Sequence, residues 1–64
     1  MLEVGKIYPT KNGMAFHCEK DISDIDVLFP FGGWVKLGDE KDRFAYYTAI
    51  GTYKLSPSEY DLVL

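Results

Sequence analysis

Residues 8–19 (YPTKNGMAFHCE) contain the clearest fold signal in the chain. The pair Asn12-Gly13 is a strong short-range signal for a β-hairpin, because both residues tolerate the positive φ angles that a type I′ turn requires. After the turn, apolar and more polar side chains alternate. One face carries Met14, Phe16 and Cys18, and the other carries Ala15, His17 and Glu19. This alternation has the period of a strand, so the stretch predicts an antiparallel hairpin in an all-β protein.

Strand-like segments recur on both sides of this hairpin, separated by Gly, Pro and polar turn residues. They cover residues 4–8, 14–19, 27–31, 34–37, 43–48, 52–55 and 60–64. We expect five or six of them to form a small antiparallel sheet or open barrel, in a single β-domain spanning residues 1–64. Gly32-Gly33 is expected to form a bend and residues 38–42 a polar turn. Residues 20–26 fit either one short helical turn or an acidic loop.

The size of the chain limits how it can be stabilised. It has 64 residues, 47% of them hydrophobic and 16% aromatic, and a single Cys, so no internal disulfide can form. A domain of this length buries only about 60% of the surface that its unfolded chain exposes. Dense aromatic packing or a second subunit must supply the remaining stability. We therefore expect a homo-oligomer.

Several functional classes are disfavoured by composition. One Cys and one His cannot build a four-ligand zinc site, so we expect neither metal nor cofactor. The chain has no apolar run of about 20 residues and no signal-peptide pattern, so no membrane span or export is expected. With 7 Lys and Arg against 10 Asp and Glu, it is not expected to bind nucleic acid directly. The free thiol fits a reducing compartment, which predicts the cytoplasm.

The stretch Val4-Gly5-Lys6-Ile7-Tyr8-Pro9-Thr10-Lys11-Asn12-Gly13 resembles the opening of a widespread group of small phage-encoded proteins. Their pattern is Gly-Lys-x-Tyr-x-Thr-(Arg/Lys)-(Asp/Asn)-Gly, with Lys11 here where Arg is commoner. Three later segments are similar to the same group: the Pro- and Gly-containing residues 29–33, the aromatic-Thr-x-x-Gly-x-Tyr residues 47–53, and Asp-Leu-Val at 61–63. Residues 20–26 match nothing in the pattern. The resemblance implies a compact all-β phage protein whose host compartment is the cytoplasm, and it brings no catalytic residues.

His17 and Cys18 are the residues with obvious acid–base or nucleophilic chemistry. Neighbours in a strand point to opposite faces, so the two cannot form a hydrogen-bonded Cys–His pair. Cys18 is expected to pack in the core, and His17 to lie on the more polar face, where it can contact a ligand. We expect no enzymatic activity.

Aromatic residues are the most informative candidates for a contact surface. They lie on both faces of the expected strands, which is more than one face of a small sheet can hide, and surplus apolar surface marks contact sites. The candidate binding residues are Phe31, Trp34, Tyr46, Tyr47, His17 and Arg43. Packing in the core is the alternative for Phe29, Trp34 and Tyr46. The acidic residues fit solvated turn charges or a face that docks on a basic partner.

Together these features predict a non-catalytic phage protein that acts by stoichiometric binding and counters a host anti-phage function. Its target is either a host protein or a small nucleotide-like signal that it sequesters. The alternative is a structural or accessory phage module that supports a larger assembly.

Overall fold

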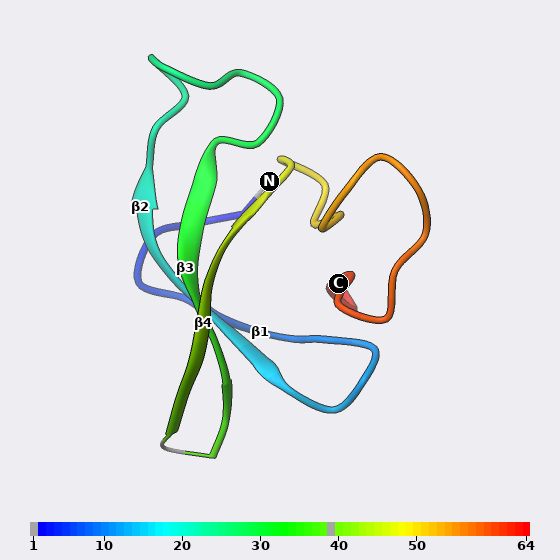
Figure 1. Ribbon diagram of the computed structural model, residues 1–64. Helices are drawn as coiled ribbons and strands as arrows, with labels where there is room; N and C mark the ends of the chain where they lie inside the picture. The colour runs from blue at the N-terminus through cyan, green and yellow to red at the C-terminus, as the bar shows by residue number, and fades with distance from the viewer. Residues whose placement is uncertain (1, 39) are drawn as a thin grey trace.

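The computed structural model of the protein describes residues 2–38 and 40–64, and in them four strands form one antiparallel sheet (Figure 1). The strands are β1 (Ile7–Pro9), β2 (Ala15–Asp21), β3 (Phe31–Leu37) and β4 (Glu40–Tyr47). They pair in chain order, so each strand lies beside its neighbour in sequence. The predicted all-β, antiparallel class is confirmed. Asp39, which belongs to the expected turn at 38–42, lies outside the described residues.

The expected number of strands was too high. Residues 4–6 form a turn, with Gly5 at φ 89° and the Lys6 N–H bonded to the Glu3 carbonyl at 3.2 Å, so β1 begins only at Ile7. Residues 52–55 form no strand, and residues 60–64 contribute one isolated bridge, between Thr10 and Leu62. Short apolar runs between turn residues also occur in irregular segments, which is why periodicity overcounted them.

The segment between β2 and β3 is a loop with one tight turn. The Ile22 carbonyl accepts bonds from the N–H groups of Ile25 and Asp26, each at 2.8 Å, and no helix follows within the described part of the chain. The Asp26 carboxylate then accepts the N–H groups of Leu28 and Phe29 at 3.0 and 2.9 Å. The Asp26 carboxylate therefore shapes the loop. Of the strand expected at 27–31, only Phe31 lies in a strand of the structure.

The hairpin turn between β1 and β2 has a different geometry from the one expected. Gly13 has φ 88°, but Asn12 keeps a negative φ, so the turn is not type I′. Thr10 and Met14 close a loop of three residues, with the Thr10 N–H bonded to the Met14 carbonyl at 2.9 Å. The Asn12 side chain accepts bonds from the Thr10 hydroxyl and the Met14 N–H. These local bonds hold Asn12 and leave the positive φ to Gly13 alone, as three-residue hairpin loops do.

Gly32 and Gly33 lie inside β3 and not in a bend. A Cβ atom on Gly33 would lie 1.9 Å from the backbone oxygen of His17 in β2, so only glycine fits where the strands approach. The pairing between β2 and β3 shifts register between Cys18 and Lys20, immediately beside this approach. The expected bend was wrong because these glycines permit close strand packing instead of a reversal of the chain.

The core lies on one face of the sheet. Each of its side chains is at least 93% buried: Leu2, Phe16, Cys18, Phe31, Val35, Ala45, Tyr47 and Leu62. Phe16 and Tyr47 pack with ring centroids 4.3 Å apart. Residues 48–64 cover this face, on one side of the sheet in Figure 1. The predicted placement of Cys18 and Phe16 on the buried face of their strand is confirmed.

Backbone bonds hold the C-terminal segment to the hairpin of β1 and β2 and to the turn that follows β4. The Val63 N–H bonds the Pro9 carbonyl and the Leu62 N–H bonds the Gly51 carbonyl, both at 2.8 Å. The segment thereby joins the end of β1 to the turn that follows β4. Within it, the buried Asp61 carboxylate accepts the N–H groups of Tyr53 at 2.9 Å and Ser58 at 3.2 Å. The Asp61 carboxylate therefore links distant parts of the covering segment to one another, whereas backbone hydrogen bonds attach that segment to the sheet.

Replacing Asp61 with Ala should lower the free energy of unfolding by about 1–3 kcal/mol, because two amides lose their acceptor in a buried setting. Asp24→Ala, at an exposed position in the loop between β2 and β3, is the matched control and should change stability by less than about 0.5 kcal/mol. Urea denaturation followed by circular dichroism measures both. Equal stability of the two variants would contradict the role given to Asp61.

Gly33→Ala should lower the free energy of unfolding by more than about 3 kcal/mol, because its Cβ meets backbone that cannot move without separating β2 from β3. Gly32→Ala is the control. Its Cβ would meet the Tyr46 ring at 2.7 Å and the Phe44 ring at 3.1 Å, which are side chains that can turn aside. A smaller loss is expected there. A larger loss of stability in Gly32→Ala than in Gly33→Ala would contradict the close approach of Gly33 to the backbone of β2.

Candidate functional site

The face of the sheet opposite the core carries a row of aromatic side chains. All four strands lie in one sheet, so no other strand or helix of the described residues covers this face. Trp34 is half-buried, while Phe44 and Tyr46 are 37% and 36% exposed. Trp34 and Phe44 meet edge to face with centroids 5.2 Å apart, and Phe44 and Tyr46 do so at 5.4 Å. We refer to Trp34, Phe44 and Tyr46 as the outer aromatic row.

The register of the strands builds this row. His17 in β2, Trp34 in β3 and Phe44 in β4 lie side by side across the sheet. In the same way Lys20, Gly32 and Tyr46 are in register. Because Gly32 has no side chain, the rings of Phe44 and Tyr46 occupy the space above it. Glycine at this position therefore lets the two aromatic rings lie against the sheet.

Lys20 accompanies the row. The Nζ atom of Lys20 lies 5.0 Å from the centroid of the Phe44 ring and 5.7 Å from that of Tyr46, within cation–π range. His17 is half-buried beside Trp34 on this same face. The outer face thus combines aromatic surface with a polar and cationic border, and sequence reasoning placed His17, Trp34 and Tyr46 among the candidates for it.

Two of the expected contact residues lie in the core instead. Phe31 is 4% exposed and Tyr47 fully buried, so neither offers surface to a partner. The Tyr47 hydroxyl donates to the Tyr60 carbonyl at 2.7 Å, and burial, together with smaller contributions from Tyr53 and Asp61, raises its pKa. It stays a neutral donor inside the protein. Tyr46, by contrast, lies on the outer face, because Ala45 and Tyr47 face Phe16 and Val35.

Arg43 is separated from the outer aromatic row. It is in register with the buried Val35 and therefore belongs to the core side of β4. Its guanidinium lies 5.1 Å from the centroid of the Tyr60 ring, and its Nη1 contacts the Tyr53 hydroxyl at 3.4 Å. The structure does not bring Arg43 together with His17, Trp34 and Tyr46. Lys20 and Phe44 take part in the outer face instead, and sequence reasoning missed both.

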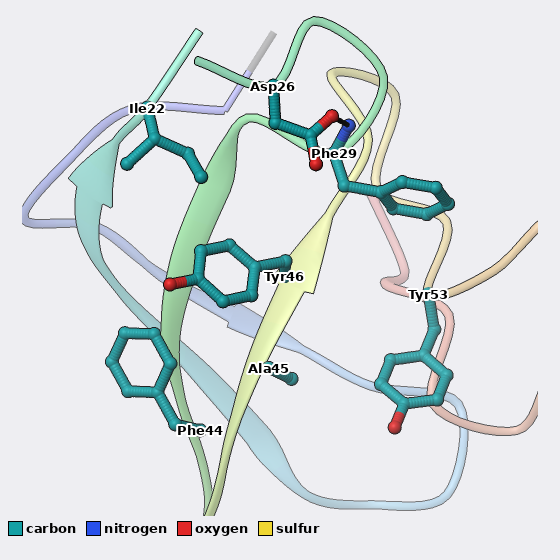
Figure 2. Close-up of a pocket in the computed structure, with 7 residues that line it drawn as sticks. All are labelled: Ile22, Asp26, Phe29, Phe44, Ala45, Tyr46 and Tyr53. Atoms are coloured by element: carbon teal, nitrogen blue, oxygen red, sulfur yellow. Dashed lines mark hydrogen bonds between the residues drawn. The ribbon is translucent and has the colours of Figure 1, made fainter.

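A hollow of about 510 Å³ lies beside β4. It is lined by Ile22, Asp26, Phe29, Phe44, Ala45, Tyr46 and Tyr53. Figure 2 shows Phe44 and Tyr46 to one side of β4 and Phe29 and Tyr53 to the other. The small side chain of Ala45 lies between them. The hollow therefore follows the strand and continues the outer aromatic row around its side.

A second hollow, of about 550 Å³, is mainly aliphatic. Four of its lining residues are exposed large hydrophobic side chains: Val27, Leu28, Ile50 and Leu55. They come from the loop before β3 and from the irregular segment after β4. No aromatic side chain lines it, which distinguishes it from the hollow beside β4.

Cys18 is unsuited to nucleophilic chemistry. It is 3% exposed, and burial, with a smaller contribution from the Asp21 carboxylate, raises the pKa of its thiol. A thiol that stays protonated is a poor nucleophile. Among residues 2–38 and 40–64, no three His, Cys, Asp or Glu side chains lie close enough together to hold a metal ion. Across the same residues no helix has the length and apolarity needed to cross a bilayer.

Comparisons of this chain with models of protein families, with curated proteins and with solved structures found no match. The assignment of a site therefore depends on the geometry described above.

The buried thiol should react with a thiol reagent at pH 8 at least about 100-fold more slowly in the native protein than in guanidinium chloride. The reaction is followed by the absorbance of the thiolate that the reagent releases. Cys18→Ala should abolish the signal and keep partner binding unchanged. Loss of binding by a folded Cys18→Ala variant would give the thiol a chemical role that its burial argues against.

Proposed function

We propose that this chain is a non-catalytic phage protein that binds a host protein stoichiometrically in the host cytoplasm and thereby counters an anti-phage function. The observation that carries the proposal is the outer aromatic row, which lies at the surface on the face of the sheet opposite the core. Trp34, Phe44 and Tyr46 are the partner contacts, and Lys20 and His17 border them.

The chemistry of this face fits a protein interface. Tyr and Trp are enriched among the residues that dominate binding energies, and such residues lie at the centre of an interface within a more polar rim. The edge-to-face contacts of Phe44 with Trp34 and Tyr46 support the rings before any partner arrives. Less side-chain entropy is then lost on binding. Lys20 can pair with an acidic group of the partner once it moves from the rings.

Two further observations support the wider setting. The resemblance of residues 5–13, 29–33, 47–53 and 61–63 to small phage proteins supports a phage origin. The burial of Cys18 and the separation of His17 on the opposite face support binding without catalysis, because a nucleophile and its base need to meet.

A small nucleotide-like signal is the second candidate target, and the hollow beside β4 favours it. Its volume of about 510 Å³ lies within the range of small-molecule sites, and the Phe44 and Tyr46 rings offer surfaces on which a base can stack. Lys20 could neutralise one phosphate. The Asp26 carboxylate lines the same hollow and would repel a phosphate there, which is why a protein target is placed first.

A tagged copy captured from infected host cells tests the proposal. It should retain one dominant host protein at equal stoichiometry, and Trp34→Ala or Phe44→Ala should weaken that binding at least about 30-fold, as loss of a central interface residue does. Ile50→Ala, in the aliphatic hollow, is the matched control and should bind normally. Each variant is first shown to be folded by circular dichroism.

Other outcomes contradict this assignment. Retention of a phage protein would favour the accessory role, and a small molecule found by native mass spectrometry, with no protein retained, would favour sequestration. Normal binding by Trp34→Ala and Phe44→Ala together with loss in Ile50→Ala would move the contact to the aliphatic hollow.

A further inference from the structure

The two edges of the sheet differ in whether they can pair with another strand. At one edge, β1 has only three residues, ends in Pro9, and is joined by Val63 of the C-terminal segment. At the other edge, β4 has eight residues and a strand neighbour on one side only. A strand that lacks a neighbour presents N–H and C=O groups to which a further strand can bond. β4 is therefore the edge available for pairing.

The outward backbone groups of β4 can be assigned from the alternation along an antiparallel strand. The Thr48 N–H bonds the Thr52 carbonyl at 3.0 Å, in the segment that follows β4, and so points away from β3. In an extended chain every second residue directs its N–H and C=O to the same side. Tyr46 and Phe44 therefore direct theirs outward, whereas Ala45 and Tyr47 bond to β3.

The hollow beside β4 adjoins these groups. Phe44, Ala45 and Tyr46 of β4 line the hollow. Phe29 and Tyr53 line its opposite side, as Figure 2 shows. The space therefore contains exposed apolar surface together with unpaired backbone donors and acceptors. An extended strand satisfies both requirements, whereas a helix or a lipid chain cannot bond the backbone groups.

We propose that the strand that fills this space is β4 of a second copy of the chain. An antiparallel arrangement with its two-fold axis at Ala45 sets Phe44 of each copy opposite Tyr46 of the other. Both of these residues direct their backbone groups outward, so each such pair exchanges both of its hydrogen bonds. The small Ala45 side chains meet at the axis. The interface is isologous, with the same residues contributed by both copies.

Charge complementarity favours a second copy over an unrelated strand. Arg43 lies toward the beginning of this stretch of β4, and Asp26 lies beyond Tyr46, where β4 ends (Figure 2). Antiparallel pairing brings the beginning of one β4 next to the end of the other. Arg43 of each copy then approaches Asp26 of its partner, and the two-fold axis repeats the attraction.

The size of the contact indicates a weak dimer. A standard interface removes about 800 Å² from each partner, which is roughly a fifth of the 4108 Å² that this chain exposes. Pairing centred on three residues and one hollow buries less than that, so the dissociation constant is expected between about 1 and 100 μM. The dimer unites two sheets into one and makes the outer aromatic rows of both copies continuous. It does not depend on the proposed function.

Sedimentation equilibrium on the full chain tests the dimer. Wild type should associate in the stated range, and Tyr46→Pro should weaken association at least about 30-fold because it removes an outward N–H from each copy. The fold should tolerate that change, since proline is accepted on an edge strand where the N–H faces solvent. Tyr46→Val keeps the N–H and the strand preference, and should dimerise within about tenfold of wild type.

Amide hydrogen exchange on wild type gives a second readout that needs no variant. The Phe44 and Tyr46 amides should gain protection as concentration rises, while the Ala45 amide is protected at every concentration. A wild type that stays monomeric at 1 mM overturns the proposal, as does dimerisation by Tyr46→Pro equal to wild type. Loss of the dimer in Leu55→Ser but not in Tyr46→Pro also overturns it. Trp34→Ala should still dimerise, which separates this test from that of partner capture.

Discussion

The Asp61 carboxylate accepts the amides of Tyr53 and Ser58, and the segment that it organises covers the core face of the sheet. A single four-stranded sheet has two faces, and residues 48–64 together with Leu2 cover one of them. The segment contains no regular element of its own. Backbone hydrogen bonds hold it to the rest of the fold, and the bonds that the buried Asp61 side chain accepts hold the segment together. Burial of Phe16 and Tyr47 follows from this arrangement.

Because the C-terminal segment covers one face only, the other face is left to solvent, and the aromatic residues there require an explanation. Gly32 and Gly33 in β3 have different structural roles. Gly33 permits close approach to the backbone of β2, and Gly32 makes room for the rings of Phe44 and Tyr46. The same glycine pair thus serves the stability of the sheet and the shape of its exposed surface.

The residues that carry the resemblance to small phage proteins have structural roles in this chain. Thr10, Asn12 and Gly13 form the first hairpin loop, and Asp61 anchors the C-terminal segment. Thr48 and Thr52 bond to each other through their hydroxyls and backbone after β4. The outer aromatic row, Trp34, Phe44 and Tyr46, lies outside the matched segments.

Local rules predicted much of the fold but little of the site. Alternation assigned the residues of β2 and β4 to the correct pair of faces, and the turn after Pro9 was placed correctly. Alternation could not say which face of β4 is buried, since one set contains Phe44 and Tyr46 and the other contains Ala45 and Tyr47. Either set is apolar enough for a core. For the same reason Tyr46 and Tyr47 were both named as contact candidates although Tyr47 lies in the core, and Lys20 and Phe44 were not recognised.

By itself, the sequence determined an antiparallel β-protein with a hairpin at residues 10–14, a packed Cys18 and an excess of aromatic side chains over what its core can hold. These properties follow from the two-residue period of a strand and from turn residues that act over a few positions. Only the tertiary structure decided which aromatic residues are exposed and which edge of the sheet is open. Both depend on where residues 48–64 pack, and that is determined by contacts between segments far apart in the chain, such as Pro9 with Val63 and Tyr47 with Tyr60.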